Sequence, residues 1–213
     1  KLDESHTDFL IANDCVLAAA AGSERFWAGV SINPMRADAV AEAERCADRG
    51  AVLVKVLPNA QCFDPAEPRF KAFYRTLAKR GLALLSHVGF EFSLIGQDQS
   101  VGDPGRLRPA LDEGVLVIAA HGCSTGLFVW EKYLGVMREL AARYPRFFVD
   151  TSALTLPNRV GALWRLARVP ELRGRLLFGT DYPLPVFSFP CLASPGAWWR
   201  ARGADNRFDR QAG

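Results

Sequence analysis

A regular alternation of short apolar runs with amphipathic segments is the feature that most constrains the fold of this chain. The runs begin 25 to 33 residues apart, and each is apolar along nearly its whole length. Strands that are covered on both faces have this character. The alternation therefore predicts repeated βα units and a parallel sheet. The six runs are 26–32, 51–57, 82–86, 115–120, 147–149 and 176–178.

Helical periodicity fills the segments between the runs. Val40, Ala43 and Ala47 recur at i, i+3 and i+7, as on one face of a helix. Glycines at 50, 81 and 114 stand where a left-handed residue would end a helix just before the next strand. Three further helices are predicted from residues that share one helical face. The first carries Ala12, Cys15, Val16 and Ala19. The second starts at about Gly126 and carries Trp130, Leu134, Met137 and Ala141, and the third carries Val160, Leu163, Trp164 and Ala167.

Six βα units preceded by one helix favour a (β/α)₈ TIM-barrel type of α/β fold that is incomplete. A closed barrel of eight units needs about 250 residues, and this chain has 213. No linker or shift in composition divides residues 1–213, so we expect a single domain. An open doubly wound sheet is the alternative. Its usual phosphate-binding motif, GxGxxG after the first strand, is missing.

Charge, cysteine content and hydropathy exclude several kinds of partner. The 26 basic and 23 acidic residues are scattered, without the basic stripe of a nucleic-acid-binding protein. Five cysteines without a CxxC pair fit a reduced cytoplasmic protein. No apolar run is long enough to span a bilayer, so no membrane association is expected. Because the chain begins at Lys1 rather than methionine, we expect an N-terminal truncation.

Polar side chains lie within the carboxyl-terminal part of the run 51–57 and shortly after four of the other five runs. In both candidate architectures the carboxyl ends of the strands meet at the ligand-binding edge. Two imidazoles and a carboxylate at this edge are the ligand types of Zn²⁺ or a similar divalent ion. Each residue alone has a structural explanation, such as an ion pair, a helix cap or a turn, but together they predict a metal site. The five residues are Lys55, His87, His121, Asp150 and Asp181.

A competing motif, Gly122-Cys123-Ser124-Thr125-Gly126, matches the GxSxG pattern of serine hydrolases between a strand and a helix. In that fold the catalytic histidine follows the serine along the chain. All three histidines here precede Ser124, so the usual triad cannot be assembled. The remaining histidine, His6, is expected to be a solvated residue near the N-terminus.

Taken in order, the strand ends resemble those of the amidohydrolase-related family, in the branch that includes the aminocarboxymuconate-semialdehyde decarboxylases. The resemblance runs from about residue 10 to 185. It implies a (β/α)₈ barrel of which the six predicted strands are the third to the eighth. The motifs that carry it are Ser31-Ile32-Asn33-Pro34, Val54-Lys55-Val56-Leu57-Pro58, Ser86-His87-Val88-Gly89, Ala120-His121-Gly122, Val149-Asp150-Thr151-Ser152 and Phe178-Gly179-Thr180-Asp181-Tyr182-Pro183.

Roles for three residues follow from this resemblance. His87 matches the metal-ligating histidine of the fifth strand, and His121 matches the sixth-strand histidine that binds metal or polarises the substrate and water. Asp181 matches the eighth-strand aspartate that contacts the metal and handles the proton. The implied metal ligands are therefore His87, His121 and Asp181, with His121 and Asp181 also catalytic and Zn²⁺ or Mn²⁺ as the ion. The family's first-strand His-x-His pair is absent from this sequence.

The resemblance implies a metal-dependent hydrolase that cleaves a C–N, ester or lactone bond of a small organic substrate with metal-activated water. Non-oxidative decarboxylation in the same branch is an alternative. Another is a non-catalytic barrel fragment, and a third is a Schiff-base enzyme that uses Lys55. Aromatic residues in the loops 90–99 and 187–199 suit a flat organic acid. They equally suit the core or the subunit interface of a homo-oligomer, which is the use we expect.

Overall fold

The computed structural model describes residues 10–92, 98–127 and 130–187, together with residues 196, 199, 200 and 203. Six strands form one parallel sheet in which their spatial order is their order along the chain. A doubly wound sheet reverses its strand order in the middle, so the sequential order shows the barrel type. The strands are β1 (Ala28–Ser31), β2 (Ala51–Val56), β3 (Ala83–Ser86), β4 (Val117–Ala119), β5 (Phe147–Asp150) and β6 (Leu176–Leu177).

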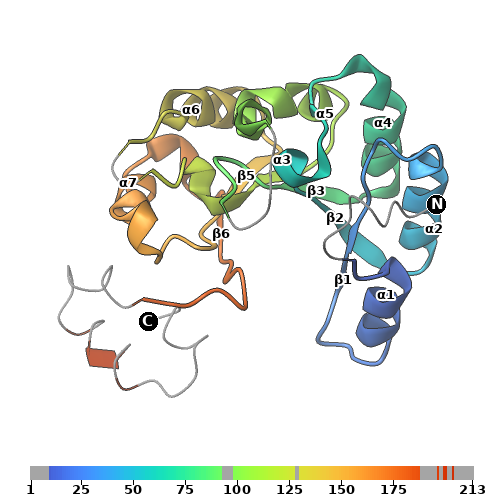
Figure 1. Ribbon diagram of the computed structural model, residues 1–213, viewed down its shortest axis with the longest axis horizontal. Coiled ribbons are helices and arrows are strands. Elements are labelled where there is room, and N and C mark those ends of the chain that lie inside the picture. The colour runs from blue at the N-terminus through green and yellow to red at the C-terminus, as the bar shows by residue number, and fades with distance from the viewer. Residues whose placement is uncertain are drawn as a thin grey trace.

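Helices follow the strands and lie in an arc outside the curved sheet (Figure 1). Gly81 closes one of them in the left-handed conformation, at φ 68°, as its sequence position predicts. The α-helices are α1 (Asn13–Ala21), α2 (Ala39–Asp48), α3 (Pro58–Gln61), α4 (Lys71–Arg80), α5 (Arg108–Asp112), α6 (Leu134–Arg143) and α7 (Ala162–Ala167). The 3₁₀ helices are η2 (Pro68–Phe70), η3 (Gln99–Gly102), η4 (Pro104–Leu107), η5 (Ala120–Cys123), η6 (Pro157–Arg159) and η7 (Pro170–Leu172).

The two faces of the sheet differ in how completely they are covered. One row of residues in register across the sheet is fully buried in the core shared with the helices, and it consists of Val30, Val54, Leu84, Val117 and Phe147. The next row points to the opposite, inner face, and Ser31 and Lys55 in that row are exposed or partly exposed. The inner face is therefore open to solvent at one side, as in an incomplete barrel.

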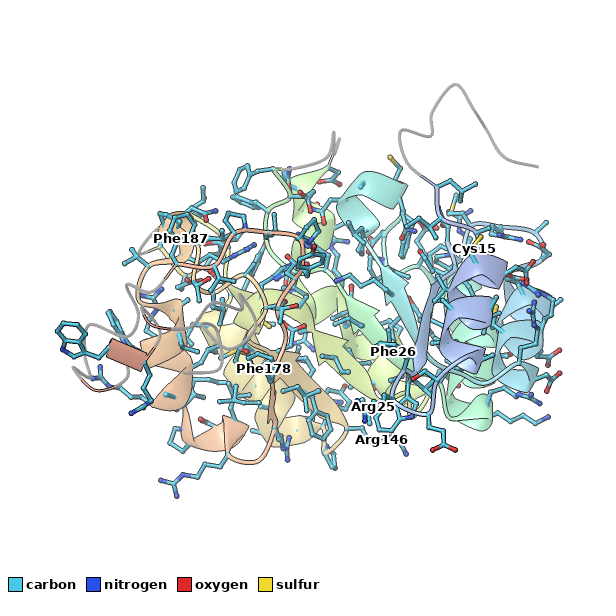
Figure 2. All side chains as sticks on the ribbon, turned by 90° about the horizontal axis from the view of Figure 1, so that it is seen from below. Cys15, Arg25, Phe26, Arg146, Phe178 and Phe187 are labelled. Atoms are coloured by element: carbon cyan, nitrogen blue, oxygen red, sulfur yellow. The ribbon has the colours of Figure 1, made fainter. Side chains whose placement is uncertain are left out.

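The two edge strands are flanked by exposed apolar residues. In the described residues β1 pairs with β2 alone and β6 pairs with β5 alone. Phe26 before β1 is 67% exposed and Phe178 after β6 is 60% exposed (Figure 2). Open strand edges with apolar neighbours are the surfaces that additional strands cover in a closed barrel. No helix in the described part of the chain is long and apolar enough to cross a bilayer.

Two sequence-based helix predictions were wrong in detail. The helix expected from about Gly126 begins only at Leu134, and Trp130 is 52% exposed. Gly126 has a φ of 73°, which is incompatible with a right-handed helix, and Thr125 N–H donates to Glu131 Oε2 instead. In α1 the buried residue is Leu17, whereas Cys15, on the predicted face, is exposed.

Candidate functional site

The ends of β3 and β4 bring His87 and His121 together. His87 follows β3 directly, and its backbone N–H donates to Val56 O, which extends the strand pairing by one residue. His121 lies in η5 directly after β4. The two rings are buried, and His87 Nδ1 is 3.1 Å from His121 Nε2. The structure thus joins two of the three predicted metal ligands.

Asp150 and Ser152 fix the orientation of His121. Asp150 Oδ1 accepts hydrogen bonds from the His121 backbone N–H at 2.8 Å and from Ser152 Oγ at 2.6 Å. His121 Nδ1 in turn lies 2.9 Å from Ser152 Oγ and 3.1 Å from Ser152 O. A carbonyl oxygen only accepts, so His121 Nδ1 carries the proton. Asp150 therefore holds His121 in place through the His121 backbone and through Ser152.

This arrangement determines which nitrogen of His87 bears a free lone pair. In a neutral His121 protonated at Nδ1, Nε2 is an acceptor, so the 3.1 Å contact requires His87 Nδ1–H as the donor. The lone pair of His87 is then at Nε2. That atom is buried and has no hydrogen-bond partner in the described part of the chain. A buried unpartnered nitrogen needs an explanation, and a bound ion or water and a catalytic role are among those available.

Burial keeps both imidazoles neutral. Desolvation and, next, the positive charge of Lys55 lower the pKa of His87 to about 4. Desolvation also lowers the pKa of His121 well below its ordinary value, with the charge of Arg159 as the next cause. Neutral imidazole is the form that binds metal ions.

Asp181 lies beside this pair but on the other side of His121. Its Oδ2 is 4.0 Å from His121 Nδ1, and its side chain is about one-third exposed. Desolvation is the main cause that raises the pKa of the Asp181 carboxyl. Both Asp181 and His121 have a positive φ, at 57° and 59°, which costs energy for non-glycine residues. Backbone strain of this kind is concentrated at functional sites.

Lys55 reaches the same edge from β2. It lies in the inner row of the sheet, as an inward-facing barrel position requires. Desolvation lowers the pKa of its ammonium, while the charges of Asp150 and Asp181 raise it. The five predicted strand-end residues therefore share one electrostatic environment.

Sequence reasoning missed two further members of the site. Glu91 is buried with Oε2 3.6 Å from His87 Nδ1, and Arg159 is buried in the loop after β5. Neither directly follows an apolar run, so the strand-end rule could not find them. The nearest signal for Glu91 is its spacing of four residues from His87.

The donor chemistry of the site fits a divalent ion in part. His87 Nε2 supplies a buried lone pair without a partner among the described residues, whereas the lone pair of His121 Nε2 accepts the hydrogen bond from His87 Nδ1–H. Asp181 adds a carboxylate nearby. Among the described residues, however, no group of three or more His, Cys, Asp or Glu side chains is arranged to hold a metal ion. The residues present thus supply one free nitrogen donor, a second nitrogen that could bind an ion only after the hydrogen bond between the two imidazoles breaks, and an adjacent carboxylate.

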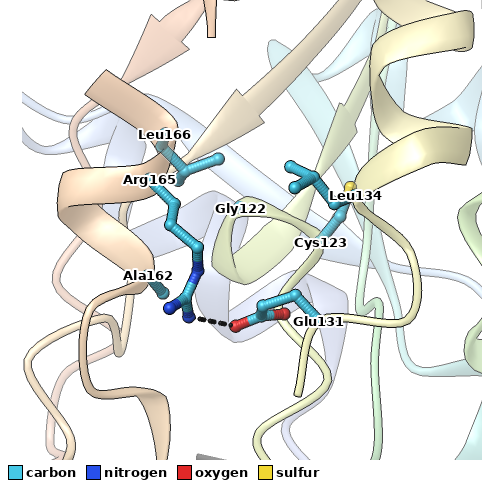
Figure 3. A pocket seen from close by; sticks show the side chains of 7 residues that line it. All are labelled: Gly122, Cys123, Glu131, Leu134, Ala162, Arg165 and Leu166. Atoms are coloured by element: carbon cyan, nitrogen blue, oxygen red, sulfur yellow. Dashed lines mark hydrogen bonds and ion pairs between the residues drawn. The ribbon is translucent and has the colours of Figure 1, made fainter. Parts of the chain in front are cut away.

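The GxSxG segment has a structural role instead. Ser124 Oγ donates to Glu131 Oε1 at 2.8 Å, and Arg165 pairs with the same oxygen at 2.8 Å. Figure 3 shows Glu131 and Arg165 facing each other beside Cys123. Burial raises the pKa of the Cys123 thiol well above its ordinary value, so this cysteine is a poor nucleophile as well.

Replacing Ser124 with alanine is therefore expected to reduce stability without affecting catalysis. Loss of a buried hydrogen bond to a charged group costs about 1.5–3 kcal/mol, measurable by urea denaturation. We expect turnover of any substrate to change less than about threefold, since the Glu131 carboxylate that accepts from Ser124 Oγ is paired with Arg165 and is therefore a weak base. Ser100→Ala, at an exposed serine, serves as the control. A folded Ser124→Ala variant without activity would refute the structural role.

Six sequential parallel strands with two imidazoles at their carboxyl ends place the chain among the (β/α)-barrel proteins. The family model described as "Amidohydrolase" matches residues 4–202. This chain belongs to the amidohydrolase family. A comparison with curated proteins gave no match.

Solved structures of similar fold agree with this assignment. An uncharacterised TIM-barrel protein from Bordetella bronchiseptica superposes with a TM-score of 0.64 at 22% identity, covering 81% of this chain and 60% of its own. 5-Carboxyvanillate decarboxylase LigW from Sphingomonas paucimobilis superposes with a TM-score of 0.58 at 18% sequence identity. The match covers 94% of this chain and 68% of LigW. 2,6-Dihydroxybenzoate decarboxylase from Rhizobium superposes with a TM-score of 0.50 at 17% sequence identity. The match covers 80% of this chain and 65% of the Rhizobium protein. At these identities the likeness establishes the fold, and the chain spans 60% of the Bordetella protein's length.

Proposed function

We propose that this chain forms most of a divalent-metal-dependent enzyme that removes CO₂ from a small aromatic carboxylic acid without redox chemistry. The observation that carries the proposal is the buried pair of His87 and His121, with an unpartnered Nε2 and with Asp181 beside it. Family membership supports metal-dependent chemistry. Two solved structures of the same fold are named for decarboxylation of aromatic acids, which favours this reaction over hydrolysis.

Three residues of the chain, His87, His121 and Asp181, would bind the metal ion and act in the reaction. A divalent ion bound by His87, His121 and Asp181 would supply positive charge to the substrate's carboxylate and a neighbouring oxygen. His121, held by Ser152 and Asp150, presents a fixed neutral imidazole. When the C–C bond breaks, its electron pair stays on the ring carbon, which then takes a proton. Asp181, which lies beside the histidine pair and is about one-third exposed, would donate that proton as the general acid and regain one from water.

Hydrolysis of a C–N, ester or lactone bond would use the same groups, with Asp181 accepting a proton from water. The two reactions differ in their products. Decarboxylation releases CO₂ and leaves a product with one carboxylate fewer, whereas hydrolysis consumes water and creates a new acid or alcohol. A non-catalytic barrel fragment would give neither product.

Release of CO₂ from ring-substituted benzoates, including 2,6-dihydroxybenzoate, tests the proposal. We expect release by the protein supplied with Zn²⁺ or Mn²⁺. Asp181→Asn should lower the rate by about 10²–10⁴-fold, because general acid catalysis contributes that much. Asp112→Asn, at an aspartate remote from the site in α5, is the matched control. Hydrolysis products from ester or lactone substrates, with no CO₂ from any acid, would refute the proposal.

A further inference from the structure

Glu91 places a buried carboxylate beside His87. The side chain is 9% exposed, and its Oε2 lies 3.6 Å from His87 Nδ1. That distance is too long for a hydrogen bond. The His87 Nδ1–H donates to His121 Nε2 at 3.1 Å instead. One buried proton therefore has a partner in His121 and a second acceptor close by in Glu91.

Metal binding through both imidazoles would change the partner of this proton. His121 Nε2 has one lone pair, which cannot accept a hydrogen bond and bind an ion at the same time. If His121 gives that lone pair to an ion, the His87 Nδ1–H loses its acceptor, and a buried unpaired donor is costly. Glu91 Oε2 is the carboxylate that needs only a small approach to replace it. Metal-ligating histidines in general donate their other N–H to a carboxylate, a carbonyl or water.

Gln99 holds the backbone of Glu91 through both of its polar groups. Gln99 Oε1 accepts from the Glu91 N–H at 2.9 Å, and Gln99 Nε2 donates to Glu91 O at 2.8 Å. Asn59 on α3 is 1% exposed, and its Nδ2 donates to the same Gln99 Oε1 at 3.0 Å. The amide of Gln99 is thus oriented by Asn59 and anchors Glu91 in turn.

The backbone between His87 and Glu91 is anchored as well. The Gly89 N–H donates to Gly102 O at 2.9 Å, and the Phe90 N–H donates to Thr125 O at 3.2 Å. Together with the two bonds from Gln99, these contacts fix three consecutive residues to other loops of the site. The Glu91 carboxylate therefore extends from a fixed backbone and stays close to His87.

On the basis of the metal-dependent site in the proposed function, we infer that Glu91 is a positioning residue, which accepts the His87 Nδ1–H when both imidazoles bind the ion. Gln99 is the side chain that holds Glu91 in place for this role. No covalent bond changes, because the proton stays on His87 Nδ1 and only its acceptor differs between the metal-free and the metal-bound protein.

Zinc affinity, measured by competition with a chromophoric chelator, tests the role of Glu91. Glu91→Ala should lower the affinity about 10–100-fold, as expected for the partner of a metal-ligating histidine. Glu91→Gln should retain part of it, since an amide oxygen still accepts but carries no charge. Ser124→Ala, which is expected to weaken the fold, should stay within about threefold of the wild type. Unchanged affinity in Glu91→Ala, an equal loss in Ser124→Ala, or no zinc binding by the wild type would overturn the inference.

A double-mutant cycle tests whether Gln99 acts through Glu91. Gln99→Met alone should lower the zinc affinity by a smaller factor than Glu91→Ala. Added to Glu91→Ala, it should change the affinity by less than about twofold, because the carboxylate that it positions is already gone. Fully additive losses would show that Gln99 acts independently and would overturn its assignment.

A crystal structure of the zinc-loaded protein shows the change of acceptor directly. The distance from His87 Nδ1 to Glu91 Oε2 should shorten from 3.6 Å to about 2.7–2.9 Å, as in a charge-assisted hydrogen bond. A hydrogen bond between the two imidazoles that persists with zinc bound would overturn the inference. Zinc binding that depends on Glu91, without CO₂ release from any acid, would refute the proposed reaction alone. CO₂ release with unchanged zinc affinity in Glu91→Ala would refute the Glu91 assignment alone.

Discussion

Replacing His87 with alanine is expected to lower the affinity of this protein for Zn²⁺ by at least about 100-fold. Loss of a residue that merely supports a metal ligand costs about 10–100-fold, and His87 Nε2 is proposed as a ligand itself. The atom is buried, and no protein group among the described residues competes for its lone pair. Titration against a chromophoric chelator measures the change.

Lys55→Met is the control for this variant. The lysine shares the site but is not proposed as a ligand, and its charge disfavours a nearby cation. Metal affinity should therefore stay the same or rise in Lys55→Met. Equal zinc affinity in wild type and His87→Ala, or loss of zinc in Lys55→Met, would contradict the proposed ligand set.

Replacing Gly102 with alanine is expected to destabilise the protein by roughly 3 kcal/mol, at the upper end of the usual cost of overpacking. An added Cβ would lie within 2.1 Å of Gly89 O, and Gly89 N–H already donates to Gly102 O at 2.9 Å. Because the obstacle is backbone, no side chain can rotate away. Gly89 is two residues beyond His87, so zinc affinity should fall as well. Chemical denaturation measures the stability change.

Gly135→Ala is the matched control for this substitution. Gly135 lies in α6 and an added Cβ meets nothing within 4 Å. Alanine in an exposed helix is favoured over glycine by up to about 1 kcal/mol. We therefore expect Gly135→Ala to be neutral or stabilising. If Gly102→Ala were as stable as Gly135→Ala, the close approach of the two loops would be wrong.

Hydrophobic periodicity was sufficient to predict the sheet. All six apolar runs coincide with a strand, and in β1 to β5 the residues that face the helices are buried in the core, which favours apolar residues there. The exact ends differ, as β4 covers only Val117–Ala119 within the run 115–120. The family resemblance found in the sequence is confirmed by the match over residues 4–202.

Other parts of the site could not be predicted from local patterns. Ser152 orients His121 through contacts 31 residues apart in the sequence, and Arg159 lies in a loop without periodicity. The helix expected from Gly126 was prevented by hydrogen bonds from Ser124 and Thr125 to Glu131, which no helical pattern reveals. The aromatic loops 90–99 and 187–199, which were expected to cover the core or a subunit interface, lie in large part outside the described residues.

X-ray absorption spectroscopy of the zinc-loaded protein tests the central claim most directly, because the imidazole signal counts histidine ligands. We predict two imidazole nitrogens at about 2.0–2.1 Å from the metal in the wild type and one in His87→Ala. A spectrum without histidine ligands, or one unchanged by His87→Ala, would contradict the assignment of His87 and His121 as a metal-binding pair.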